Sequence, residues 1–66
     1  MIKDVLRKIV DGAHLSQDEA VSAMTEIMNG EATPAQVASF ITALRMKGET
    51  IDEIIGFVKV MRDKSI

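Results

Sequence analysis

One short pattern recurs along this chain of 66 residues and limits its fold more than any other feature. A serine or threonine is followed three residues later by a glutamate or glutamine, at Ser16–Glu19, Thr33–Gln36 and Thr50–Glu53. In such a capping box, the hydroxyl accepts a hydrogen bond from the N–H of the later residue, whose side chain accepts one from the N–H of the cap. The pattern therefore predicts three helix starts, each cap contributing about 1 kcal/mol.

Apolar spacing supplies the rest of the secondary structure. Before the first box, residues 2–10 carry apolar side chains at i, i+3, i+4 and i+7, which predicts a further helix. Gly12, Gly30 and Gly48 are placed to end the first three helices, and Pro34 suits the first position of the third. We expect an all-α fold, a small bundle of four short helices at about 2–10, 17–29, 34–47 and 51–63. The short loops favour antiparallel neighbours.

The last two helices raise the question of which face is buried. In the third, Val37, Phe40, Ile41 and Leu44 form a stripe that other apolar residues widen, so we expect this helix to be central. In the fourth, we expect the core face to consist of Ile51, Ile54, Ile55, Val58 and Met61. Phe57 and Val60 would then form a second apolar edge of that helix.

The high apolar content, 47% of a very short chain, suggests a docking face. A domain of this size buries only about 60% of the surface that its unfolded chain exposes. Gly56, inside the fourth helix, suits close approach by another helix. The candidate interface residues are Phe40, Ala43, Met46, Gly56, Phe57 and Val60. The alternative is that these are scattered surface hydrophobes, and the methionines are expected to pack in the core.

Few residues offer chemistry. The adjacent acids Asp18–Glu19 and Asp52–Glu53 could form acid–base pairs, but their positions at helix starts favour stabilisation of the helix dipole. His14 could be a general base or a ligand, but a loop position without a second histidine or any cysteine favours a solvated loop residue. We therefore expect no catalytic, cofactor-binding or metal-ligating residue in this chain.

Charge and hydropathy exclude several partners. The formal net charge is −2, and the helix after Gly48 would present acids to DNA, so no nucleic acid is expected. No apolar run is long enough to span a membrane. Charges interrupt the apolar residues of MIKDVLRKIV, unlike those of a signal peptide. These features predict a cytoplasmic chain.

Residues 15–62, LSQDEAVSAMTEIMNGEATPAQVASFITALRMKGETIDEIIGFVKVMR, resemble the N-terminal helical domain of the anthranilate phosphoribosyltransferase family. The most specific segments are GEATPAQVASF and ALRMKGET. This family shares a glycosyltransferase superfamily with the pyrimidine nucleoside phosphorylases, which carry a similar Gly-Glu-x-x-Pro-x-x-Gln pattern. The resemblance makes residues 1–66 the helical domain of a larger enzyme whose catalytic α/β domain lies outside this chain.

The resemblance implies an activity for that larger enzyme. It would transfer phosphoribose from phosphoribosyl pyrophosphate to anthranilate, with Mg²⁺, in tryptophan biosynthesis. The helical domain would contact its own α/β domain, frame one wall of the substrate cleft and join two copies in a homodimer. It would be inactive alone, because the family's diphosphate-binding and metal-binding motifs are not found in these residues. The alternatives are the helical domain of a pyrimidine nucleoside phosphorylase, or a stand-alone helical interaction module.

Overall fold

The computed structural model describes residues 2–64, except for the side chain of Lys64, and consists of helices joined by loops. The helices are α1 (Ile2–Val10), α2 (Gln17–Met28), α3 (Pro34–Lys47) and α4 (Ile51–Lys64). The predicted all-α fold is confirmed. Helix α2 ends one residue earlier than predicted because Asn29 is its C-cap. The N–H of Asn29 donates to Thr25 O at 3.0 Å, and that of Gly30 donates to Ile27 O at 3.1 Å.

All three internal helix starts carry both hydrogen bonds of a capping box. The backbone N–H of the third helical residue donates to the cap hydroxyl at 3.1–3.2 Å, and the cap N–H donates to the acid or amide at 2.8–3.0 Å. The pairs are Ser16–Glu19, Thr33–Gln36 and Thr50–Glu53. Pro34 occupies the first turn of α3, as the sequence predicted.

Glycines end the first two helices by the same mechanism. Gly12 and Gly30 have φ of 84° and 74°, a left-handed conformation that is accessible to glycine at little cost. After α1, the N–H of Ala13 donates to Lys8 O at 2.9 Å, and the N–H of Gly12 donates to Ile9 O at 2.9 Å. This is a Schellman ending, in which two otherwise unpaired helix carbonyls gain partners.

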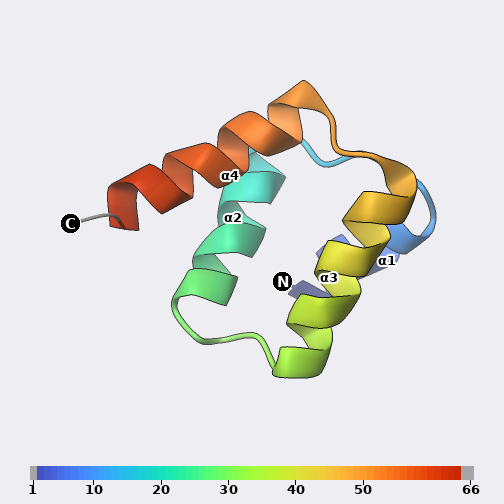
Figure 1. Cartoon of the computed structure of the whole chain (residues 1–66), viewed down its shortest axis with the longest axis horizontal. Coiled ribbons are helices and arrows are strands. Elements are labelled where there is room, and N and C mark those ends of the chain that lie inside the picture. Colours follow the sequence, from blue (N-terminus) through green and yellow to red (C-terminus); the bar gives the residue numbers. More distant parts are fainter. Residues whose placement is uncertain (1, 65–66) are drawn as a thin grey trace.

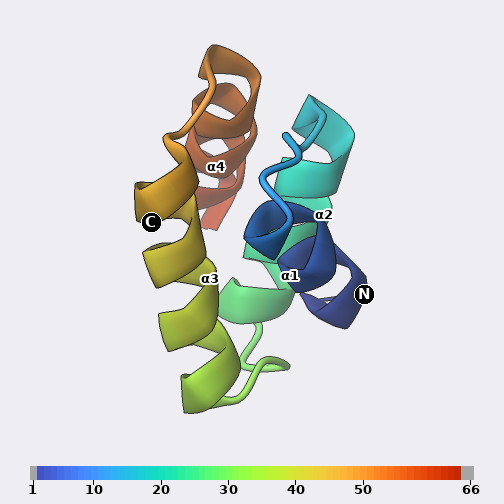
Figure 2. The ribbon, with the colours of Figure 1, turned by 90° about the vertical axis from the view of Figure 1, so that its right-hand side faces the viewer.

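The helices pack mainly as two pairs, α2 with α4 and α1 with α3, and α1 also touches α2 (Figure 1). Figure 2 shows α1 and α2 on one side of the molecule and α3 and α4 on the other, so each main pair joins the two sides. The two helices of a main pair are therefore not consecutive in the chain, and the expectation that short loops make consecutive helices antiparallel neighbours is wrong. The packing leaves a flat molecule of 34 × 25 × 17 Å.

Every helix contributes to one apolar core. Phe40 of α3 and Phe57 of α4 meet edge to face, with ring centroids 5.8 Å apart, and so connect the two helix pairs. Helix α1 contributes the buried side chains of Ile2, Val5 and Ile9, which belong to its apolar pattern. The buried cluster consists of Ile2, Val5, Ile9, Leu15, Ala20, Ala23, Phe40, Leu44 and Phe57.

The predicted core face of α4 is wrong. The side chains on the inner face of this helix are those of Glu53, Phe57 and Val60, with Gly56 between them. The predicted face is the exposed one, here called the α4 row: Ile51, Ile54, Ile55, Val58 and Met61. Both rows have helical spacing, but only the inner row contains a glycine, whose small size allows close contact with α2.

The expectation that α3 is central is also wrong. Phe40 and Leu44 are buried, but Ile41 and Met46 are exposed. The methionines pack less than predicted: Met24 contacts the core, whereas Met28, Met46 and Met61 are exposed. The flat arrangement explains this difference, because each helix covers only one side of its neighbours. None of the helices in the described range is long and apolar enough to cross a membrane.

Candidate functional site

Among the described residues, the charged side chain that is completely buried is that of Glu53, which is 0% exposed. Its Oε2 accepts a hydrogen bond from the backbone N–H of Leu15 at 2.7 Å. Its Oε1 accepts from the Lys47 ammonium and from the N–H of Thr50, each at 2.8 Å. One carboxylate therefore joins the loop before α2, the end of α3 and the start of α4, and we call this cluster the Glu53 junction.

The charge state of Glu53 follows from these contacts. Burial by itself raises the pKa of a carboxyl group, because it disfavours the charged form. Hydrogen bonds from the N–H of Leu15, the Lys47 ammonium and the N–H of Thr50 outweigh that effect. The pKa of Glu53 consequently lies below its ordinary value. The junction is thus a buried ion pair whose carboxylate also receives two backbone donors.

His14 lies at the edge of this junction. Its Nδ1 is 3.0 Å from the Lys47 ammonium, which also donates to Gly48 O at 2.9 Å. Because an ammonium can only donate, Nδ1 is the acceptor in this contact. Within the described residues, no group of three or more histidine, cysteine, aspartate or glutamate side chains could hold a metal ion.

Two of the other acids that the sequence singled out, Glu19 and Asp52, have structural partners. Glu19 accepts from the Lys8 ammonium at 2.7 Å and from the N–H of Ser16. These two contacts, the Lys8 hydrogen bond first, lower the pKa of Glu19. Asp52 accepts from the Gln17 side-chain amide at 3.1 Å. Both acids therefore stabilise local structure, and their geometry does not suggest acid–base pairs.

The candidate interface residues fall into two groups. Phe40, Phe57 and Val60 are buried inside this chain, and Gly56 lies against α2. These four cannot form an exposed docking face, so their assignment to one is corrected by the structure. The close helix approach inferred from Gly56 does occur, but within the chain. Ala43 is half-buried and Met46 is 84% exposed, so these two lie on the surface.

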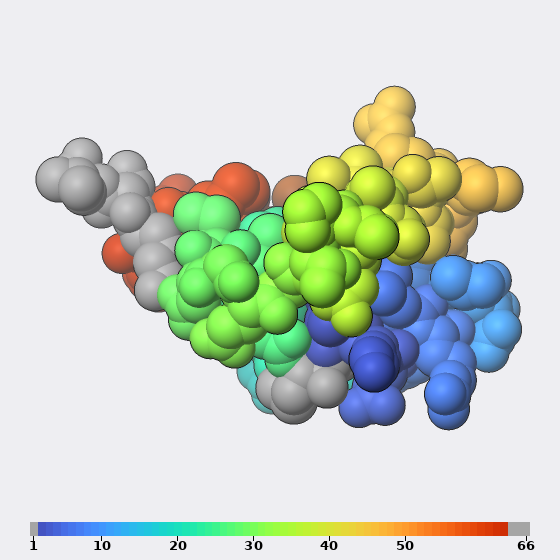
Figure 3. Space-filling view, turned by 90° about the horizontal axis from the view of Figure 1, so that it is seen from below, coloured from blue at the N-terminus to red at the C-terminus, as the bar shows by residue number. Residues whose placement is uncertain are grey.

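Ala43 and Met46 belong to a shallow groove of ≈ 370 Å³ beside the end of α1. Val10, 70% exposed, is the α1 residue in this groove. We define the α1–α3 patch as Val10, Ala38, Ser39, Thr42, Ala43 and Met46. Figure 3 shows α3, in yellow and yellow-green, lying against the blue α1. The sequence pattern indicated Ala43 and Met46 but not Val10, because folding alone brings Val10 next to these residues of α3.

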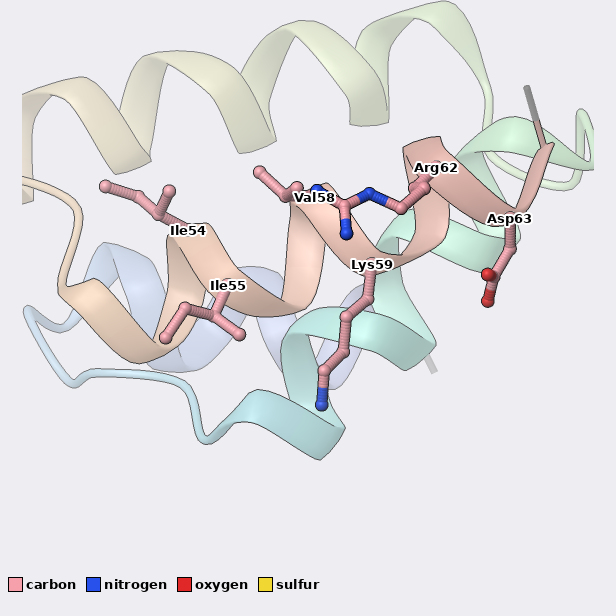
Figure 4. A pocket seen from close by; sticks show the side chains of 6 residues that line it. All are labelled: Ile54, Ile55, Val58, Lys59, Arg62 and Asp63. Atoms are coloured by element: carbon pink, nitrogen blue, oxygen red, sulfur yellow. The ribbon is translucent and has the colours of Figure 1, made fainter.

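A second apolar surface lies on the other side of α3. It is a groove of ≈ 380 Å³, the α3–α4 groove, lined by Ile41, Leu44, Glu49, Ile54, Phe57, Val58 and Met61. A neighbouring hollow of ≈ 580 Å³ lies along the outer surface of α4. In Figure 4, Ile54 and Val58 project from α4 toward α3, whereas Ile55 and Lys59 project from another side of the helix. All members of the exposed α4 row except Ile51 thus line one or both of two adjoining depressions.

The described residues therefore offer two apolar contact surfaces, the α1–α3 patch and the α3–α4 groove, together with the buried Glu53 junction. Residues 3–65 match a family described as "Glycosyl transferase family, helical bundle domain". The chain is 58% identical over 65 residues to an anthranilate phosphoribosyltransferase of Pelotomaculum thermopropionicum, covering 98% of this chain and 19% of that protein. It is 56% identical over 64 residues to one of Desulfotalea psychrophila, covering 97% and 18%.

A third relative, the anthranilate phosphoribosyltransferase of Moorella thermoacetica, is 58% identical over 66 residues. That alignment covers 100% of this chain and 20% of the relative. The chain thus spans about a fifth of the length of the curated relatives that it matches.

Proposed function

Because the chain belongs to the glycosyl transferase family through its helical bundle domain, we propose that it is the N-terminal helical domain of an anthranilate phosphoribosyltransferase. The observation that carries the proposal is 56–58% identity, over nearly the whole chain, to proteins of that name. The complete enzyme would transfer phosphoribose from phosphoribosyl pyrophosphate to anthranilate, a step of tryptophan biosynthesis in the cytoplasm. Its α/β domain would supply the catalytic residues and the Mg²⁺ site.

Within that enzyme, the helical domain would frame the substrate cleft rather than act on the substrates. The partners of its acids support this division. Glu19 and Glu53 are engaged by lysines and by backbone N–H groups, and Asp52 by the amide of Gln17. A side chain held in this way serves to fix the ends of helices. We expect the helical domain alone to show no transfer activity.

The helical domain would also join two copies of the enzyme. The surface that supports this role is the α1–α3 patch, where Val10 and Met46 are largely exposed. A two-fold interface places the same patch of both subunits in contact, so a self-complementary apolar surface is suitable. Small neighbours such as Ala38, Ser39 and Ala43 would allow close approach of two α3 helices.

The experiment is an assay of the complete gene product. We expect anthranilate to be consumed only when phosphoribosyl pyrophosphate and Mg²⁺ are both present, and the 66-residue chain alone to be inactive. Phosphorolysis of pyrimidine nucleosides instead would assign the protein to the nucleoside phosphorylases. If the natural gene product proved to be only this helical chain, a stand-alone interaction module would be the correct interpretation.

A further inference from the structure

The chain leaves α2 through Asn29, its only asparagine, and Gly30. Both residues are exposed, and the loop that they open, green in Figure 1, lies at the lower edge of the molecule. The backbone nitrogen that follows an asparagine can attack the carbonyl carbon of its side-chain amide. A glycine in the second position hinders this attack least, because it has no Cβ atom. The end of α2 therefore places an exposed amide next to the backbone nitrogen that is best able to react with it.

We propose that Asn29–Gly30 is a self-modification site, at which the chain deamidates through a succinimide when the end of α2 opens. The deprotonated nitrogen of Gly30 forms a bond to Asn29 Cγ, the bond from Cγ to the side-chain nitrogen breaks, and ammonia leaves. Water then opens the five-membered ring at either carbonyl, which gives aspartate or isoaspartate. In sum, one water is consumed, one ammonia is released, and a carboxyl group replaces the amide. No other residue and no enzymatic activity are needed, so the reaction is independent of the proposed function.

The native ending of α2 holds the two reacting groups apart. Asn29 has a ψ of 1°, which eclipses the nitrogen of Gly30 with the nitrogen of Asn29 rather than with its Cβ atom. Ring closure needs the nitrogen of Gly30 and Cβ on the same side of the Cα–C bond. The N–H of Gly30 also donates to Ile27 O at 3.1 Å, and that of Glu31 donates to Glu26 O at 2.9 Å. Rotation about ψ must break this Schellman pair of hydrogen bonds before the ring can close.

Such an opening is a local event. The ends of helices open at a much lower free energy than the whole domain, because few contacts must be broken. The native ending should therefore slow deamidation without preventing it. The rate at Asn29 then reports how often the end of α2 opens.

The product changes the charge at the end of α2. This helix has acids in its first turn and no basic residue in its last turn. A carboxylate at position 29 would face the negative end of the helix dipole, between Glu26 and Glu31 in the sequence. Isoaspartate also lengthens the backbone by one carbon atom, which shifts the donors of the Schellman ending. The modified chain should therefore hold this ending less firmly than the parent chain.

Asp11–Gly12 provides an internal reference for the reaction. This pair ends α1 with the same Schellman pattern, both hydrogen bonds being 2.9 Å long. Its side chain is a carboxylate, which is a poorer electrophile than an amide. Isoaspartate should therefore appear at Asn29 well before it appears at Asp11.

The test is peptide mapping of the full-length protein after incubation in mildly alkaline buffer, under native conditions and in urea. Mass spectrometry locates the gain in mass when OH replaces NH₂, and an isoaspartate-specific methyltransferase labels the rearranged product. We expect the peptide that contains Asn29 to react in both samples, at least about tenfold more slowly in the native protein. Asn29→Gln keeps an amide but would need a larger ring, so it should abolish both signals at this position.

A matched pair of variants tests the hydrogen bonds of the ending. Glu31→Pro removes the N–H that donates to Glu26 O, whereas Glu31→Gln keeps this N–H and changes only the charge. Relative to its own rate in urea, native Glu31→Pro should deamidate faster than the parent protein, and Glu31→Gln should match the parent.

Four results would overturn the proposal. In the parent protein these are no deamidation at Asn29 under native conditions, equal rates in native protein and urea, and isoaspartate at Asp11 as early as at Asn29. The fourth is a native Glu31→Pro protein that reacts no faster than Glu31→Gln. The first three do not depend on the folding of any variant.

Discussion

Gly56 of α4 lies directly against Ala20 of α2. A Cβ atom at position 56 would be 2.7 Å from Ala20 Cβ and 2.8 Å from the carbonyl oxygen of Gln17. Neither neighbour can move away by rotating a flexible side chain. The main helix pair of the fold therefore depends on the absence of a side chain at one position.

Gly56→Ala should destabilise the chain although alanine is the better helix former. Alanine gains up to about 1 kcal/mol in helix propensity. Forcing a methyl group into a closely packed site costs about 1–3 kcal/mol, and here backbone atoms must shift. We expect a net decrease in the melting temperature, followed by circular dichroism. Ser39→Ala, at an exposed position of α3, is the control and should be neutral or slightly stabilising. A stabilised Gly56→Ala chain would contradict the close α2–α4 contact.

The Glu53 junction makes a second prediction. Lys47→Met would leave the buried carboxylate with two backbone donors and no counter-ion. Removing one partner of a buried ion pair typically costs about 3–5 kcal/mol, and the remaining donors place this variant at the lower end. Lys8→Met is the matched control, because the Lys8–Glu19 pair is partly exposed and should contribute little. Urea unfolding at neutral pH measures the unfolding free energy of both variants. Equal losses of unfolding free energy would show that burial of the Lys47–Glu53 pair adds nothing to stability.

Acid should weaken the fold through the same residue. The pKa of Glu53 is lower in the folded chain than in the unfolded chain, so unfolding takes up a proton at acidic pH. The stabilisation is present above the unfolded pKa of about 4.3 and is lost as the pH falls through the folded value. Lys47→Met removes one interaction that lowers the folded pKa. Its unfolding free energy should therefore vary less between about pH 5 and pH 3 than that of the parent chain. An unchanged pH dependence would show that other carboxyl groups control acid unfolding.

The helix caps, the inner face of α4 and Glu53 show how much of the fold and of the site the sequence could predict. The caps and helix bounds depend on residues only three or four positions apart, so local patterns were sufficient to find them. The inner face of α4 was predicted wrongly because two apolar rows compete on one helix, and Gly56 decides between them only by contact with α2. Glu53 was recognised as a helix-start residue, but its bond to Leu15 spans 38 positions and exists only in the folded chain.

The predicted cap of α3 can be tested separately. Thr33→Ala removes the hydroxyl that accepts the N–H of Gln36 at 3.1 Å, and the expected loss is about 1 kcal/mol. Thr42→Ala makes the same chemical change at an exposed position inside α3 and should cause no loss. Thermal unfolding of the two variants side by side separates the cap from the general effect of replacing threonine. If both variants matched the parent chain, the hydroxyl of Thr33 would not stabilise the start of α3.

Self-association should depend on the α1–α3 patch. Met46→Asp places a charge on a side chain that is 84% exposed in the single chain, so it should not disturb folding. In a two-fold interface the two introduced carboxylates would lie near each other and be desolvated, which disfavours assembly. We expect light scattering of the full-length protein to show weaker dimerisation for Met46→Asp than for Glu31→Asp, an exposed control outside the patch. A full-strength dimer in the Met46→Asp variant would remove the α1–α3 patch as the dimer surface, because an interface centred on this side chain could not accept two buried charges without loss.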